Sequence, residues 1–283
     1  MTSQPKLETA PYIPHLGDPS PFPESDRVIY ARNPLEFVIC QLRFPAILKI
    51  SSGPPADFQE SLRRFYPLYR EIPPVDIATG FPPELVNVIG NLLPNQGSKT
   101  YEFSTQDGNW QVTLTQESLA LSCKRYVRWE EFRELLLSAL ELLLRIYEPS
   151  FFTRIGLRYR DVIARNQLGL SDVPWRDLLS RELAAEFHSR VAQSIENTGH
   201  QIVLRLQDDV AKVTLQHGLG NKSGEICYII DSDFYVNERT GARDATRILD
   251  YFNRQAGRLF RWCITDRLHQ AMEPQRVERQ RSG

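Results

Sequence analysis

Three arginines in one short stretch are the side chains of this sequence best suited to bind a ligand. The stretch is FFTRIGLRYRDVI, residues 151–163, and its even positions carry Arg154, Arg158 and Arg160. Its odd positions are mostly apolar, and this alternation is typical of a strand between two different environments. The planar fork of a guanidinium group matches the oxygens of phosphate and carboxylate. The stretch therefore predicts a strand with one face in the core and a cationic stripe on the other.

Further cations join this stripe if neighbouring strands belong to the same sheet. Acidic residues that lie close to it in the predicted strands support another interpretation, in which cross-strand ion pairs screen the charge and no anion binds. These screening carboxylates would be Asp161, Glu225, Asp231 and Asp233. The complete candidate site for an anionic ligand is Arg43, Arg154, Arg158, Arg160, Arg205 and Lys212.

Two aspartates raise the question of a metal. Asp231 and Asp233 alternate in the stretch IIDSDF and so point to the same side of a strand. Carboxylates in that arrangement could hold Mg²⁺ against a phosphate-rich substrate. The alternative is that both aspartates are solvated residues near a strand end. Apart from this possible Mg²⁺, the sequence predicts no cofactor.

The common catalytic motifs are missing from the sequence. The five histidines show no HxxxH or HExxH spacing, and no serine or cysteine lies in a GxSxG-like turn. The loop HGLGNKSG has Asn221 where a phosphate-binding loop needs glycine before Lys222, and a strand follows it. We interpret this loop as a hairpin connection.

Composition gives limits on class and partners. The 283 residues include 34 basic and 35 acidic side chains and a formal net charge of −1, which argues against recruitment of nucleic acid or an anionic membrane by overall charge. Four widely spaced cysteines in apolar runs are typical of reduced, buried thiols. The N-terminus lacks the pattern of a secretory signal, and no apolar run approaches the about 20 residues of a membrane span. We expect a cytoplasmic protein without a membrane partner.

Hydrophobic periodicity predicts the elements that position these side chains. Residues 1–27 hold six prolines and predict a flexible arm, in which Tyr12 and Phe22 contact the domain. A first half over 28–165 and a second half over 166–271 follow, and residues 272–283 read as a charged tail. In the first half we expect a strand over 34–44 and then a helix over 56–71 that Pro67 kinks or ends early. A long connection over 73–96 follows, which could hold a helical turn or a short strand at 84–93. Three strands over 101–124, a helix over 129–147 and the strand 151–163 complete this half.

The second half repeats this order loosely. A helix is expected from Asp172 to Phe187, followed by three strands in HQIVLRLQ, VAKVTLQH and EICYIIDSDFYV, and by a long helix over 242–271. The predicted fold class is α+β, with antiparallel sheet or sheets backed by helices and two loosely repeated halves joined by the long C-terminal helix.

Two short motifs also suggest a relative. Pro34-Leu35 opens the first strand and Gly156-Leu157-Arg158-Tyr159 lies in the later one. Over roughly residues 28–271 the chain resembles a sporadically distributed bacterial family of uncharacterised proteins that has a Pro-Leu opening strand and a later G-L-R-Y strand. Arg160-Asp161 stands where the family pattern leads us to expect asparagine. The resemblance implies a shared fold and supplies no activity.

Three functional hypotheses follow. The first is a noncatalytic binding or interaction protein that presents a cationic sheet face or cavity to an anionic small molecule or protein partner. The second is a metal-dependent enzyme that acts on a phosphate-rich substrate with Asp231, Asp233 and the arginines. The third is a structural component of a bacterial assembly. The sequence leaves the ligand and the oligomeric state open.

Overall fold

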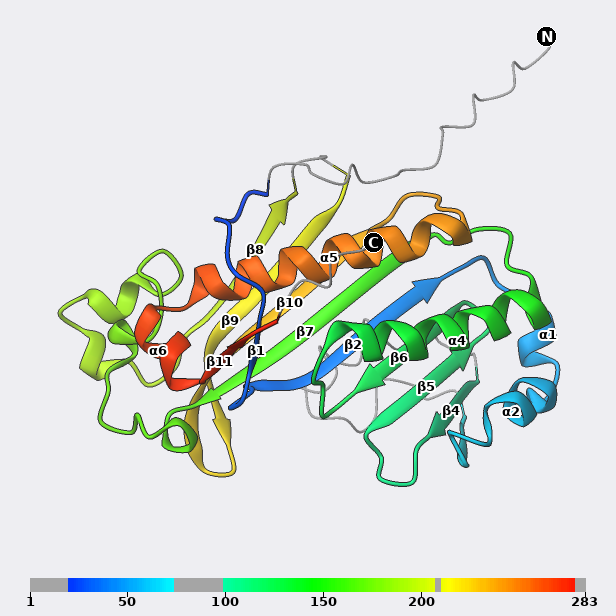
Figure 1. Cartoon of the computed structure of the whole chain (residues 1–283), viewed down its shortest axis with the longest axis horizontal. Coiled ribbons are helices and arrows are strands. Elements are labelled where there is room, and N and C mark those ends of the chain that lie inside the picture. Colours follow the sequence, from blue (N-terminus) through cyan, green and yellow to red (C-terminus); the bar gives the residue numbers. More distant parts are fainter. Residues whose placement is uncertain (1–19, 74–98, 207–209, 278–283) are drawn as a thin grey trace, which may run out of the picture.

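A nine-stranded antiparallel sheet runs the length of the molecule (Figure 1), and the computed structural model describes residues 20–73, 99–206 and 210–277. The antiparallel sheet backed by helices confirms the predicted α+β class. In spatial order its strands are β3 (Leu68–Ile72), β4 (Thr100–Ser104), β5 (Trp110–Thr115), β6 (Ser118–Cys123), β2 (Leu35–Arg43), β7 (Arg154–Ala164), β10 (Glu225–Val236), β9 (Lys212–Lys222) and β8 (Gly199–Arg205).

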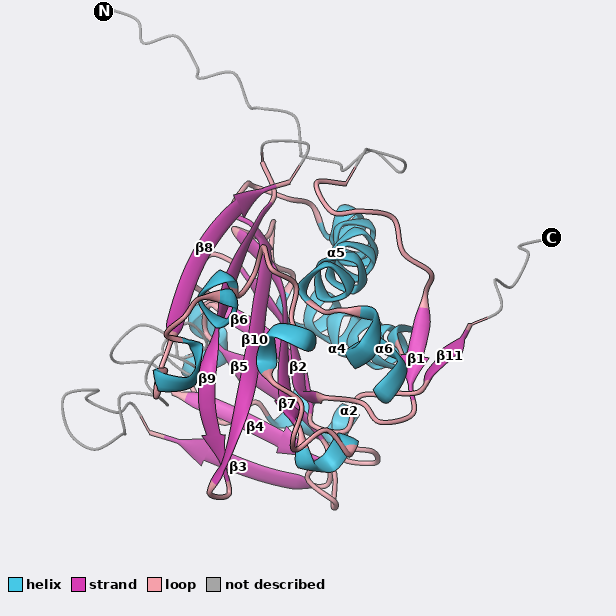
Figure 2. Ribbon diagram, turned by 90° about the vertical axis from the view of Figure 1, so that its left-hand side faces the viewer, coloured by secondary structure: helices cyan, strands magenta, loops and turns pink. Residues whose placement is uncertain are grey.

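Two long helices cover one face of this sheet (Figure 2): α4 (Trp129–Tyr147) and α5 (Ala242–Cys263). The alternation along β7 explains the layering, because Ile155, Leu157 and Ile163 are fully buried under the helices. The even positions point to the opposite face. Shorter helices extend the layer: α1 (Leu48–Ser51), α2 (Ala56–Leu62) and α6 (Asp266–Ala271). No helix in the described ranges is long and apolar enough to cross a membrane.

The chain forms two similar halves about the central pair β2 and β7. On one side β6, β5 and β4 follow β2, and on the other β10, β9 and β8 follow β7. Each half ends with its long helix, α4 after β6 and α5 after β10. The strand order places β7 with the second half, whereas the sequence predicts it in the first half over 28–165.

A two-stranded ribbon joins the two ends of the described chain. Strand β1 (Val28–Tyr30) pairs with β11 (Pro274–Arg276) in a ribbon that lies outside the helix layer (Figures 1 and 2). We call this ribbon the strap. Phe22 and Met272 are buried in the core, so parts of the predicted arm and tail belong to the fold. The predicted contact through Tyr12 lies outside the described residues, as does most of the connection over 73–96 with its expected turn at 84–93.

The helix predicted over 56–71 ends early, as expected from Pro67. It ends at Leu62, and residues from Leu68 onward form β3 because Pro67 lacks the N–H that helix continuation requires.

The predicted helix over 172–187 is wrong, and the predicted helix over 242–271 is interrupted. Both departures have one cause, because the two segments bond to each other: Ser180 N donates to Cys263 O at 2.9 Å and Thr265 N donates to Leu178 O at 2.9 Å. These bonds replace the helical pattern, and the Thr265 side chain then caps α6 by accepting from Leu268 N. The segment instead contains two short turns, η2 (Trp175–Asp177) and η3 (Ala185–His188), and η1 (Asn166–Leu168) and η4 (Ala192–Ser194) lie on either side of it.

Candidate functional site

All six basic residues of the predicted anion site lie on the sheet face that points away from α4 and α5. In the strand register, Arg43 of β2 stands opposite Arg154 of β7, and Arg205 of β8 stands opposite Lys212 of β9 at the far edge of the sheet. Directly opposed residues of an antiparallel pair share a face. Arg158 and Arg160 oppose Asp233 and Asp231 of β10 on this same face. The six are thus on one face but spread over four strands.

Carboxylates neutralise the central arginines. Arg158 donates from Nε and Nη2 to the two oxygens of Asp231 at 2.7 and 2.8 Å, in a buried bidentate pair. Arg160 reaches Asp231 at 3.1 Å and Glu36 at 3.0 Å, and Arg154 reaches Asp233 at 2.8 Å. We call this set the arginine ladder. It matches the ion-pair interpretation of the stripe, with both aspartates serving as partners of arginine.

The metal hypothesis gains no support from the ladder. Within residues 20–73, 99–206 and 210–277, no group of three or more His, Cys, Asp or Glu side chains could hold a metal ion. Asp231 and Asp233 each bind a guanidinium group instead.

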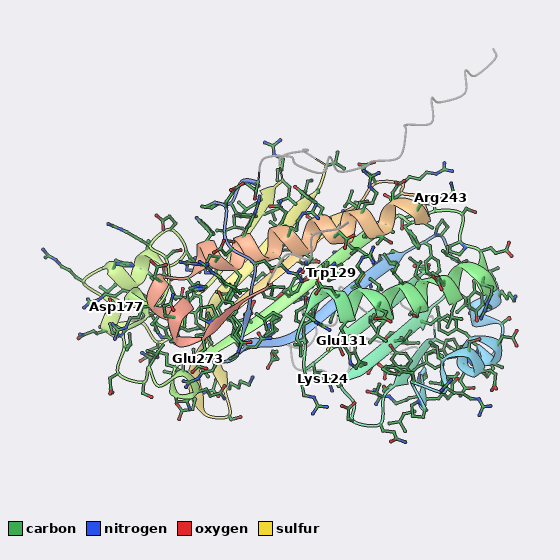
Figure 3. All side chains as sticks on the ribbon, viewed as in Figure 1. Lys124, Trp129, Glu131, Asp177, Arg243 and Glu273 are labelled. Carbon is green, nitrogen blue, oxygen red and sulfur yellow. The ribbon has the colours of Figure 1, made fainter. Side chains whose placement is uncertain are left out.

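A cavity of about 720 Å³ lies on the opposite, helix-covered face. Its walls are α5, the N-terminal end of α4 and the strap, and Trp129 marks the α4 wall in Figure 3. The Trp129 indole donates to Asp250 of α5 at 2.7 Å, which fixes the two helices beside the opening. Its floor is formed by β7 and β10. We call this cavity the strap pocket, and its size is in the range of small-molecule sites.

Asp161 is the polar group at the floor of the strap pocket. Its side chain lies between those of Leu35 and Ile230 on the neighbouring strands and is 5% exposed. In the described part of the chain it has no side-chain hydrogen bond or ion pair. Burial, and then the charge of Asp231 on the other face, raise the pKa of Asp161 well above its usual range. A neutral Asp161 offers an O–H donor beside a carbonyl acceptor.

The sequence contains the signal for Asp161, although we predicted it as a screening carboxylate of the arginine face. Its odd position in 151–163 places it on the apolar side of the strand. The structure shows it there, on the face opposite Arg158 and Arg160. A carboxyl group in an apolar register is a candidate binding residue.

Tyrosines form the sides of the strap pocket. Tyr159 donates to Asn253 Oδ1 of α5 at 3.0 Å, and its ring meets that of Tyr126 edge-on at 6.0 Å between centroids. On the strap side, Tyr30 bonds His269 Nδ1 at 2.7 Å and its ring lies 5.8 Å from that of Phe260. Burial raises the pKa of all three hydroxyls, so they are neutral.

Arginines surround the mouth of the strap pocket. Of seven that line it, four are paired with carboxylates, and the remaining three have no ion pair with any residue that the structure describes. The three are exposed. Asp26, Asp161 and Asp250 are the only acidic residues among the described residues that line the pocket. The mouth therefore carries an excess of positive charge, with Arg128, Arg247 and Arg254 available to an anion.

A scan against protein-family models finds no match for the chain, and a search of curated proteins finds none either.

Proposed function

We propose that this chain is a noncatalytic binding protein whose ligand is a small organic anion held in the strap pocket. One observation carries the proposal: Asp161, unpartnered among the described residues and 5% exposed, lies at the floor of a cavity whose mouth has exposed arginines. Burying a polar group without a partner is costly, so such a group is usually satisfied by a ligand or by water. The anionic end of the ligand meets the arginines and its other end meets Asp161.

Binding without chemistry is favoured by the residues that line the strap pocket. Among those described, none is His, Cys, Lys or Glu, so Ser232 at the floor has no histidine or lysine base to activate it. Arginine stays protonated and serves as an electrostatic anchor.

The arginine ladder supports the pocket from the other face. Arg160 and Asp161 are neighbours in β7, and Arg160 is held by Asp231 and Glu36. These pairs fix the strand on which the floor is built, so the cations predicted as ligands act as scaffold in this proposal.

We also propose membership of the bacterial family with the Pro-Leu and G-L-R-Y strands. Pro34 directly precedes β2, which begins at Leu35, and Gly156 to Tyr159 lie in β7; these two strands pair at the centre of the sheet. In that family the G-L-R-Y strand would form part of the pocket floor, as β7 does here.

Native mass spectrometry of freshly purified protein tests the binding function. We expect a retained organic anion in the wild type and loss of that mass in Gly257→Leu. Gly257 lines the pocket and a Cβ placed there has no atom within 4 Å, so a leucine at this position is expected to occupy the space of the ligand. The double variant Arg128→Ala/Arg254→Ala is also expected to lose the anion. Arg243→Ala is the matched control, since Arg243 is exposed in the first turn of α5 (Figure 3) and does not line the pocket. Retention in Gly257→Leu equal to that of the wild type would contradict the proposal.

A further inference from the structure

We propose that the anion of the strap pocket is a nucleoside phosphate, with its base on Asp161 and its phosphate at the arginines of the mouth. This inference rests on the proposed function and names the ligand class of the same site. It follows from the separation of three kinds of surface within one cavity: a donor and acceptor pair at the floor, aromatic rings at the sides and cations at the mouth.

The floor suits the edge of a base. Asp161 lies in a cross-strand row between Leu35 and Ile230, so one polar group stands in an apolar setting. A neutral carboxyl group has a donor and an acceptor side by side, and each nucleobase presents an adjacent acceptor and donor on its Watson–Crick edge. Ser232, which opposes Tyr159 in the next row and lines the same floor, adds a hydroxyl that can donate or accept.

The sides suit a planar ring. Tyr126 and Tyr159 form one aromatic pair on the α4 side, and Tyr30 and Phe260 form another on the strap side. Bases that proteins read on their edges are commonly packed against aromatic side chains. A flexible aliphatic chain would use these surfaces less well and would leave the floor group unpaired.

The mouth suits phosphate. Arg128 precedes α4, while Arg247 and Arg254 lie on α5, so the three approach the opening from two helices. Guanidinium groups bind phosphate oxygens in pairs. Gly257 leaves the α5 wall open between the mouth and Phe260, since nothing lies within 4 Å of a Cβ placed there. A glycine inside an exposed helix is unfavourable, so its presence is consistent with room kept for a ligand.

Equilibrium binding of the four nucleoside 5′-monophosphates to the full chain tests this inference. We expect at least one to bind, with affinity reduced about tenfold in Asp161→Ala and largely recovered in Asp161→Asn, because asparagine also presents a donor beside an acceptor. A merely structural role of the carboxyl group would not predict this recovery. Thermal melting of each variant checks that it is folded.

Two fragments of the ligand separate the ends of the site. Ribose 5-phosphate is expected to bind more weakly to Arg128→Ala/Arg254→Ala than to the wild type, and to bind Asp161→Ala as tightly as the wild type. The corresponding nucleoside should show the reverse, and Arg243→Ala should bind every probe like the wild type.

The inference and the function can fail separately. Absence of nucleotide binding to a wild-type chain that retains another anion, lost in Gly257→Leu, would overturn the nucleotide assignment and leave the binding function standing. Equal nucleotide affinity in the wild type and Asp161→Ala would overturn the role of the floor. If Gly257→Leu retains its anion and no nucleotide binds, both proposals fall.

Discussion

Asp161 and Asp231 lie on adjacent strands but on opposite faces of the sheet, and they differ in their ion-pair partners. Asp231 binds Arg158 and Arg160, whereas Asp161 faces the strap pocket without a partner among the described residues. After burial itself, the charge of Asp231 is the next cause of the raised pKa of Asp161. Asp231 thus lies on the far side of the pocket floor, where its charge adds to burial in favouring the neutral form of the floor carboxyl group.

Asp231 is expected to matter more for stability than for binding. In Asp231→Ala, the buried Arg158 loses its bidentate partner, and removal of one member of a buried pair costs about 3–5 kcal/mol. Urea unfolding measures the free energy of unfolding directly. A double replacement, Arg158→Leu/Asp231→Leu, should cost less than the single variant because no unpaired charge remains in that pair.

The exposed pair of Arg63 and Glu60, 2.7 Å apart in α2 and the residue after it, provides the control. Glu60→Ala should change the free energy of unfolding by less than about 1 kcal/mol. Equal effects of Asp231→Ala and Glu60→Ala would show that the ladder is solvent-screened.

Gly218 occupies a position in the fold that leaves no room for a side chain. A Cβ at Gly218 in β9 would overlap the carbonyl oxygen of Thr198, which accepts a hydrogen bond from Leu219 N at 3.0 Å. Gly218→Ala should therefore destabilise the protein by about 1–3 kcal/mol in urea unfolding. In Gly53→Ala, where nothing lies within 4 Å, the same change should be neutral or slightly stabilising. Equal free energies of unfolding of the two variants would contradict the close approach of Thr198 O to Gly218.

His217 should make stability fall in weak acid. Burial, and then the nearby His200, lower its pKa from 6.5 to about 4, although Glu186 acts in the opposite direction. The ring also contacts the Tyr228 hydroxyl, 2.8 Å from Nδ1, and its Nε2 is buried without a hydrogen bond in the described structure. The folded state thus holds the neutral imidazole, while the unfolded state takes up a proton below pH 6.5. This contribution is present above pH 6.5 and is lost as the pH falls toward about 4.

Urea midpoints at pH 7.5 and 5 measure this effect. His217→Gln, which has no proton to gain, should lose less stability between the two conditions than the wild type. His188→Gln, at an exposed position, should behave like the wild type. An identical pH response of all three proteins would exclude His217 as the cause.

Local patterns in the sequence predict the sheet well and the pocket poorly, for a physical reason. Period-2 alternation assigns each side chain of β7 to a face, so the common face of Arg154, Arg158 and Arg160 follows from the chain alone. Their neutralisation depends on which carboxylates β10 brings opposite, and that register is a nonlocal property. The pocket depends further on the strap, in which Val28 pairs with Arg276 from the other end of the chain. No short-range pattern contains that contact.

Helix prediction failed where the backbone bonded to a distant partner. Leu178, Leu179 and Leu183 are buried as expected, so the apolar pattern was informative about burial. The bonds of Leu178 O to Thr265 N and of Ser180 N to Cys263 O, at the end of α5, decide the conformation instead. Such tertiary bonds override local propensity.

Phe22 tests whether the segment before β1 is part of the fold. Its side chain is 5% exposed and its ring lies 6.2 Å from that of Trp262 in α5, while Ser20 bonds Gln255 on the same helix. Phe22→Ala should therefore lower the free energy of unfolding by about 3 kcal/mol, as for other buried phenylalanines.

In the same segment, Glu24 has a distant 3.8 Å contact with Arg258 and a largely exposed side chain, so Glu24→Gln should have an effect below about 1 kcal/mol. Urea unfolding of both variants compares them, and an effect of Phe22→Ala as small as that of Glu24→Gln would mean that the segment does not contribute to stability. Because this segment leads directly into the strap, a large effect would also show that the outer wall of the pocket is anchored to α5 rather than free to open.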